Sequence, residues 1–178
     1  MPWKLKSSKE IYREEWMQIT VDNYQIGRGK LLTNAVIHKD PYALIIPWDG
    51  KKFILVGQHR YVIDFYSWEF PAGHFHSSIK ETAELELKEE TGYTAKNIRP
   101  LGFVYLAPGH HTQQCHVFLA TSLKKGKTKR DEGEKAANMK TKKVTPQQLE
   151  KMIWSGKIKD GPTLAAYSLL RASGLLKF

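Results

Sequence analysis

The chain has 178 residues, with 28 Lys and Arg against 18 Asp and Glu, a formal net charge of +10, and 41% hydrophobic residues. This length and composition fit one globular domain with a sizeable core, and they exclude a wholly disordered, collagen-like or mucin-like chain. The single cysteine, Cys115, excludes an intramolecular disulfide and a metal site built from thiolates.

The sequence carries no signal for a membrane. No apolar run approaches the roughly 20 residues that span a bilayer. Residues 1–15 are too charged for the apolar middle of a signal peptide. Because a lone cysteine suits a reducing compartment, we expect a cytoplasmic protein with no membrane partner.

The positive charge is concentrated in residues 124–143, which contain nine Lys and Arg residues and three acidic residues. A basic segment attracts polyanions such as nucleic acid or a nucleotide diphosphate through its long-range field. Such a segment is also often a solvated loop. Charge alone therefore leaves a nucleic-acid partner open without favouring it.

The first 60 residues are typical of extended segments separated by turns. Residues 16–21 alternate apolar and polar side chains, and residues 27–29 (Gly-Arg-Gly) suit a turn. Residues 42–46 and 52–56 are apolar runs on either side of an Asp-Gly turn at 49–50, which predicts two buried antiparallel strands at the centre of a sheet.

The second half of the chain mixes helices with strands. Ile79, Ala83 and Leu87 share one stripe, and Gly92 follows as a stop, so the spacing predicts a helix over 79–91. Further strands and helices are predicted in this order: strands at 99–106 and 115–121, helices at 146–153 and 162–172. Paired strands with late helices predict an α/β (α+β) class with a mixed or mostly antiparallel sheet between helices.

Three carboxylates lie on one face of the predicted helix. Glu86, Glu89 and Glu90 stand at positions i, i+3 and i+4. Their mutual repulsion destabilises the helix by roughly 0.2–0.5 kcal/mol per close pair. A bound divalent cation would turn this repulsion into a net attraction. Hard oxygen donors suit Mg²⁺, with Mn²⁺ as an alternative. The bland interpretation is an ordinary acidic face, partly compensated by Lys88.

The residues around this helix resemble the Nudix hydrolases, whose box is G-x5-E-x7-R-E-U-x-E-E-x-G-U. Gly73 and the run Glu86-Leu-Lys-Glu-Glu-Thr-Gly-Tyr93 stand for the two ends of that box. Similarity to the ADP-ribose pyrophosphatase branch extends along the chain, through Val56-Gly-Gln-His-Arg60, Trp68-Glu-Phe-Pro-Ala-Gly73, Tyr105-Leu-Ala-Pro-Gly109, Asp131-Glu-Gly-Glu134 and Lys157-Ile-Lys-Asp160. The resemblance implies an α/β/α sandwich with a mixed sheet over 41–178 and an N-terminal hairpin extension over 1–40.

The box departs from the family pattern in three ways. Gly73 and Glu86 are 13 positions apart, where the pattern has 15. The first box glutamate has no counterpart, since Ser77 or Ser78 stands near its place, and Leu85 replaces the box arginine. Because losing both members of an ion pair can be nearly neutral, we interpret the glutamate and arginine as lost together, with the metal-binding carboxylates kept.

By resemblance, site residues fall into three groups. The metal ligands are Glu86, Glu90, Glu89 as a further ligand or water-orienting carboxylate, and Ala72 through its backbone oxygen. Arg60 contacts the diphosphate, and Glu69, Pro108 and Gly109 face the substrate. The general base is Glu134, followed by Glu132. Alternatively, Glu132 and Glu134 only balance the positive charge of a lysine-rich loop.

The resemblance therefore implies a Mg²⁺-dependent hydrolase that splits the diphosphate of ADP-ribose or a related nucleoside diphosphate sugar into a nucleoside monophosphate and a sugar phosphate. It also implies a homodimer. The alternative is a Nudix-fold protein that binds a nucleotide or RNA without cleaving it, motivated by the altered box and the basic segment. Repulsive carboxylates in an anion site require a cation, which favours the enzyme.

Overall fold

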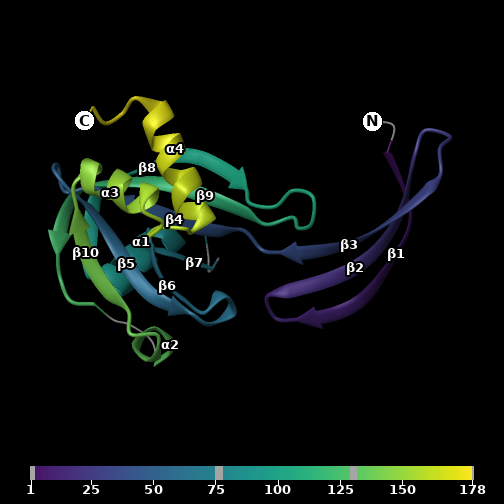
Figure 1. Ribbon diagram of the computed structural model, residues 1–178, viewed down its shortest axis with the longest axis horizontal. Helices are drawn as coiled ribbons and strands as arrows, with labels where there is room; N and C mark the ends of the chain where they lie inside the picture. The colour runs from purple at the N-terminus through teal and green to yellow at the C-terminus, as the bar shows by residue number, and fades with distance from the viewer. Residues whose placement is uncertain (1–2, 75–77, 129–131, 178) are drawn as a thin grey trace. The chain divides into compact units, whose positions relative to one another are not determined.

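The computed structural model describes residues 3–74, 78–128 and 132–177 (Figure 1). The chain forms two compact units. The first comprises Met1–Pro41 and Tyr105–Gln114, and the second comprises Tyr42–Val104 and Cys115–Phe178. Within the described parts of the chain, no helix has the length and apolar character needed to cross a membrane.

The first unit is built on an antiparallel three-stranded sheet. Strands β1 (Trp3–Glu14), β2 (Met17–Ile26) and β3 (Leu31–Lys39) follow one another in chain order. The Gly27 turn has φ +57°, a backbone conformation that glycine adopts without strain. The loop at 105–114 joins this unit because Ile37 donates its N–H to the carbonyl of His110 at 2.9 Å. The predicted N-terminal hairpins are confirmed.

The second unit contains two sheets. In the first sheet, of order β7-β4-β9-β8, strand β4 (Tyr42–Pro47) runs parallel to β9 (Gln114–Lys125) and antiparallel to β7 (Ala72–His74). Strand β8 (Tyr93–Tyr105) lies beside β9. The second sheet has the order β10-β5-β6 and joins β5 (Phe53–Arg60) to β6 (Phe65–Glu69) and β10 (Lys140–Val144). A short 3₁₀ turn, η1 (Tyr61–Ile63), links β5 to β6. The predicted mixed sheet is confirmed.

The predicted pairing of residues 42–46 with 52–56 is wrong. Strands β4 and β5 belong to different sheets, and only an isolated bridge between Trp48 and Phe53 joins the ends of these segments. Both strands are buried, and each already has a partner along both edges. The apolar runs therefore identified two central strands but carried no information about their neighbours.

Strand β10 lies in the basic segment 124–143, for which the sequence predicts no strand. Its residues Lys140, Lys142 and Lys143 are exposed, and β10 lies at the edge of its sheet. Lysine is a residue that protects edge strands from unwanted pairing. The edge position explains how a strand with so few apolar residues is accommodated.

Four helices complete the second unit: α1 (Ile79–Thr91), α2 (Glu132–Ala136), α3 (Pro146–Trp154) and α4 (Gly161–Ser173). The predicted helices at 79–91, 146–153 and 162–172 are confirmed. Figure 1 shows α1 on the far side of the strands from α3 and α4. The Ser78 hydroxyl accepts the N–H of Glu81 at 3.2 Å, and Gly92, with φ +75°, ends α1. Buried Ala83 and Leu87 place the inner face of α1 on the core.

Candidate functional site

The short strand β7 makes close backbone contact with α1. A Cβ atom added at Gly73 would overlap the carboxylate of Glu86. The absence of a side chain at Gly73 therefore creates the space in which the Glu86 carboxylate lies. The sequence places a glycine here because the carboxylate must approach the backbone of β7 closely.

Glu90 reaches the same strand one helical turn later. Its side chain is only 4% exposed, and its Oε2 accepts a hydrogen bond from the Ala72 N–H at 3.2 Å. Residues i and i+4 share a helix face, so Glu86 and Glu90 both point toward β7. Glu89 is half-buried on the same helix.

The donors at β7 fit a hard divalent cation. Two carboxylates, one of them buried, lie against the backbone of Ala72 and Gly73, and all their donor atoms are oxygens. Oxygen donors of this kind suit Mg²⁺ and Mn²⁺. Among the described residues, no three His, Cys, Asp or Glu side chains converge as a ready-made metal centre. The structure thus gathers two of the three predicted carboxylate ligands at β7.

Arg60 and Glu69, both predicted to face the substrate, pair with each other. The Nε of Arg60 donates to Glu69 Oε1 at 3.0 Å, and its Nη2 donates to Oε2. Glu69 is buried, whereas Arg60 is about half exposed. The hydrogen bonds that Arg60 donates to Glu69 raise the pKa of Arg60, and the charges of Glu69, Asp160 and Glu90 add to the increase. Arg60 therefore lies within electrostatic reach of one α1 carboxylate, Glu90.

Asp160 is a site residue that sequence reasoning missed. Its Oδ2 accepts the N–H of Thr163 at 2.8 Å and caps α4, while Thr163 Oγ1 accepts the N–H of Phe70 at 2.9 Å. This chain of contacts ties the start of α4 to the segment between Glu69 and Ala72. An Asp before Gly-Pro is a recognisable cap signal, but nothing in the sequence indicated that Asp160 lies near Arg60.

The charge state of Asp160 gives a pH-dependent prediction. Burial, followed by the nearby charge of Glu69, raises the pKa of Asp160. A raised folded-state pKa means that folding favours the neutral carboxyl, so its contribution to stability declines as pH rises through that pKa. Asp160→Asn imitates the neutral form and still caps the helix. We expect the stability of this variant relative to wild type to increase between about pH 4 and about pH 7.

Urea unfolding at both pH values measures this difference directly. The free energy of unfolding of the variant minus that of wild type should be larger at the higher pH. A difference that stays constant, or that shrinks as pH rises, contradicts the assignment of a buried, ionisable carboxyl at Asp160.

Cys115 lies on β9 and has a structural role. It is fully buried, and burial raises the pKa of its thiol to about 11. Cys115 pairs with Tyr42 across β9 and β4. A thiol with a raised pKa is a poor nucleophile, so Cys115 belongs to the core.

The predicted bases and the predicted loop residues lie elsewhere. Glu132 is exposed on α2, and the side chain of Glu134 on the same helix lies outside the described part of the structure. The end of α2 is beside β5, since His59 donates its N–H to the Ala137 carbonyl at 3.1 Å. Pro108 and Gly109 belong to the first unit. No described contact joins any of these four predicted residues to Glu86 or Glu90.

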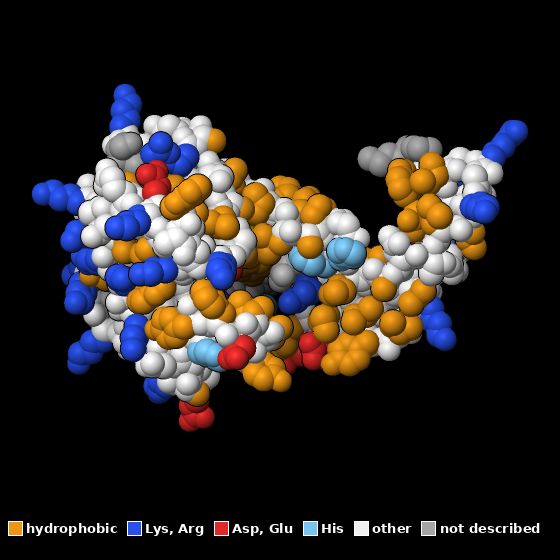
Figure 2. All heavy atoms as spheres, in the orientation of Figure 1, with side chains coloured by type: hydrophobic (Ala, Val, Ile, Leu, Met, Phe, Trp, Pro, Cys, Tyr) orange, Lys and Arg blue, Asp and Glu red, His pale blue; other side chains and the backbone are white. Residues whose placement is uncertain are grey.

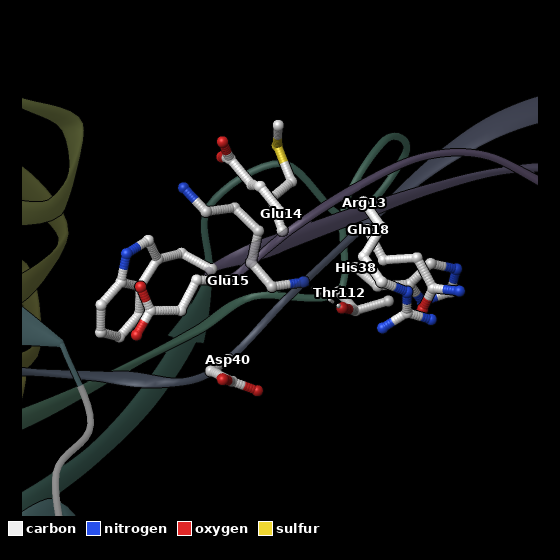
Figure 3. A pocket seen from close by; sticks show the side chains of 10 residues that line it. Arg13, Glu14, Glu15, Gln18, His38, Asp40 and Thr112 are labelled. Atoms are coloured by element: carbon white, nitrogen blue, oxygen red, sulfur yellow. Dashed lines mark hydrogen bonds between the residues drawn. The ribbon is translucent and has the colours of Figure 1, made fainter.

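The first unit contains a hollow of its own, shown in Figure 3. It has a volume of about 330 Å³ and lies at the turn between β1 and β2 and the end of β3. Arg13, Gln18 and His38 gather on one side of the view and Glu15 lies on the other. Acidic and basic side chains both line the hollow, so its charge does not favour an anionic or a cationic ligand.

Comparison with known proteins decides the family. The NUDIX domain model matches residues 38–167. The chain belongs to the Nudix family. The ADP-ribose pyrophosphatase of Bacillus subtilis is 30% identical over 179 residues, covering 98% of this chain and 95% of that protein. A GDP-mannose pyrophosphatase of Yersinia enterocolitica is 31% identical over 100 residues, covering 56% of this chain and 52% of its own length.

A solved structure agrees with the Nudix assignment at the level of fold. The crystal structure of an ADP compounds hydrolase superposes with a TM-score of 0.85, covering 99% of this chain and 98% of that one, at 17% sequence identity. The predicted family and fold class are therefore confirmed, including the α/β/α arrangement with a mixed sheet. As a Nudix hydrolase, the chain keeps the carboxylates that face β7 although its box is shortened.

Proposed function

We propose that this Nudix hydrolase cleaves the diphosphate of ADP-ribose or a related nucleoside diphosphate sugar, releasing a nucleoside monophosphate and a sugar phosphate, with Mg²⁺ as its metal. The observation that carries the proposal is the convergence of Glu86 and Glu90 on β7 in a Nudix chain. The pyrophosphatase names of the relatives from Bacillus subtilis and Yersinia enterocolitica support the substrate class.

We assign separate roles to the residues around β7 in binding the metal ion, binding the diphosphate and activating the attacking water. Glu86, Glu90 and the backbone oxygen of Ala72 would hold the divalent ion. When bound, such an ion neutralises charge on a diphosphate and lowers the pKa of a coordinated water. Glu89 would orient the attacking water. Arg60 has five N–H donors, of which Glu69 uses two, so the others can donate to a diphosphate oxygen.

For the general base we propose Glu134, followed by Glu132. Their helix α2 ends beside the last residues of β5, the strand that carries Arg60. A carboxylate arriving from this side would accept the proton of the attacking water. Pro108 and Gly109 remain proposed substrate contacts from the loop between β8 and β9.

A non-catalytic, polyanion-binding role is the second candidate. Figure 2 shows many Lys and Arg side chains on the surface of the second unit. On β10, the Nζ of Lys142 lies 5.3 Å from the centre of the Trp68 ring, an arrangement that combines a cation with an aromatic surface. Two neighbouring carboxylates that meet at β7, Glu86 and Glu90, favour a bound cation, which a polyanion-binding surface does not require. We therefore favour hydrolysis.

The substrate is identified by measuring nucleoside monophosphate and sugar phosphate release from a panel of nucleoside diphosphate sugars. The reactions contain Mg²⁺, Mn²⁺ or a chelator. We expect metal-dependent release of both products from at least one member, with ADP-ribose the first candidate. Absence of product from every member, together with salt-sensitive binding of RNA, would support the second candidate instead.

We further propose that the sheet of the first unit pairs with a second copy of the chain. Strand pairing places Leu5 opposite Tyr24, and Tyr24 opposite Leu32, so these side chains form one row across all three strands. Leu5 is 63% exposed and Leu32 is 41% exposed. Trp3 packs beside the row, with its ring centre 5.3 Å from that of Tyr24. An exposed apolar row of this size is typical of an interface.

Replacement of Leu5 by Lys tests the proposed homodimer. The added charge would be buried without a partner in the interface, so we expect the molar mass measured by light scattering to fall from dimer to monomer. Ala35→Lys is the control, because Ala35 pairs with Val21 and lies on the opposite face of the sheet. A monomeric wild type, or a dimer unaffected by Leu5→Lys, contradicts the proposal.

The proposed compartment is the cytoplasm. The only cysteine is a buried free thiol, which needs no oxidising environment.

A further inference from the structure

A pocket of about 430 Å³ opens in the second unit at the end of β5, η1 and the start of α4. Three kinds of group line it: the Arg60–Glu69 pair, the carboxyl of Asp160, and the apolar side chains of η1. By resemblance, Arg60 contacts the diphosphate of the substrate. The residues of this pocket indicate that the space next to Arg60 holds a part of the ligand other than the diphosphate.

The charges in the pocket do not suit a phosphate. The guanidinium of Arg60 is bound by both oxygens of Glu69, which neutralise its charge. His59 bonds to Asp64 at 3.0 Å. Asp160 adds a second carboxyl with no cation of its own at hydrogen-bond distance among the described contacts. A phosphate placed here would meet acceptors that repel it, whereas a hydroxyl could donate to them.

The turn η1 supplies an apolar surface to the same pocket. Tyr61 is 90% exposed, Val62 is 89% exposed and Ile63 is 62% exposed. Three consecutive apolar residues seldom remain in water without a role. An apolar surface beside a small number of hydrogen-bonding groups is the usual makeup of a small-molecule site.

We propose that this pocket binds the polyhydroxylated sugar ring of the substrate, with Asp160 accepting from its hydroxyls and Tyr61 packing on its C–H face. The inference rests on the proposed function, because it assigns the two ends of a nucleoside diphosphate sugar. The diphosphate then lies between Arg60 and the α1 carboxylates, and the sugar extends past Arg60 toward α4. Asp160 and Tyr61 thus determine which sugar is accepted.

Isothermal titration calorimetry with each product alone measures the affinity of the protein for one end of the substrate at a time. Ribose 5-phosphate and mannose 1-phosphate report on the sugar end, and AMP and GMP report on the nucleoside end. Asp160→Asn should weaken binding of the preferred sugar phosphate about tenfold, because its single amide oxygen cannot accept both the Thr163 N–H and a sugar hydroxyl. Binding of the nucleoside monophosphate should stay within about twofold. Tyr61→Ala should also weaken binding of the sugar phosphate. Because Tyr61 is 90% exposed, this variant should fold as the wild type does.

Asp22→Asn is the matched control. It makes the same change at a carboxylate on β2 that accepts the Ser8 hydroxyl and does not line the pocket. Unchanged sugar phosphate binding in Asp160→Asn, or failure of the wild type to bind either sugar phosphate, overturns the inference. Weaker binding of AMP or GMP instead would assign the pocket to the nucleoside and also overturn it. These titrations need no turnover, so failure of the proposed hydrolysis would appear separately, as a wild type that releases no product.

Discussion

Replacement of Glu90 by Gln is expected to reduce metal-dependent product release at least about 100-fold, beyond the 10–100-fold typical of groups that only support metal ligands. The amide keeps the shape of the side chain and an oxygen that accepts the Ala72 N–H, so the fold should persist. It removes the negative charge that a divalent cation requires. Steady-state kinetics at saturating Mg²⁺ measure the effect.

Glu84→Gln is the control for this experiment. Glu84 lies on the same helix but is about half exposed and pairs with Lys80 at 3.5 Å on the solvent side. We expect its turnover to match wild type. Comparable rates in Glu90→Gln and wild type would remove Glu90 from the metal site.

The second large effect is expected from Gly73→Ala. The new methyl group would occupy the position of the Glu86 carboxylate. Because that carboxylate is the end of a flexible side chain, it can swing away with little loss of stability. A displacement of about 1 Å in a catalytic group can cost about 100-fold in rate. We therefore expect turnover to fall by about this factor, with a raised requirement for Mg²⁺.

The control for Gly73→Ala is Gly161→Ala, at the start of α4. A Cβ atom there meets no atom within 4 Å, and the residue lies within a helix. This variant should keep the turnover and the Mg²⁺ dependence of the wild type, because it changes no residue at β7. If Gly73→Ala keeps wild-type turnover and wild-type Mg²⁺ dependence, the close approach of Glu86 to β7 has no catalytic role.

The positions of the helices and strands were more predictable from the sequence than the pairing of the strands. Helix α1 was predictable from the stripe of Ile79, Ala83 and Leu87 and from the Gly92 stop, because both signals are local. The separation of β4 from β5 was not, since a strand buried on both faces has no side-chain pattern that indicates its neighbours. Strand β10 was missed because exposed lysines mask an edge strand.

The candidate site was predictable to a similar extent. The i, i+4 spacing of Glu86 and Glu90 placed both carboxylates on one face, and the structure adds the contact with β7. The pairing of Arg60 with Glu69 was not predictable from the resemblance, which implies a separate contact with the substrate for each residue. Asp160 was missed because its proximity to Arg60 depends on how α4 packs.

The central claim is that the shortened box still forms a metal site at β7. The most direct measurement is a titration of Mn²⁺ into the metal-free protein, followed by electron paramagnetic resonance of the free ion, in wild type and in Glu90→Gln. We predict saturable Mn²⁺ binding by the wild type that Mg²⁺ displaces, and a clear loss of affinity in the variant. Equal binding by both proteins, or no binding by either, would contradict the claim that Glu86 and Glu90 hold a divalent cation against β7.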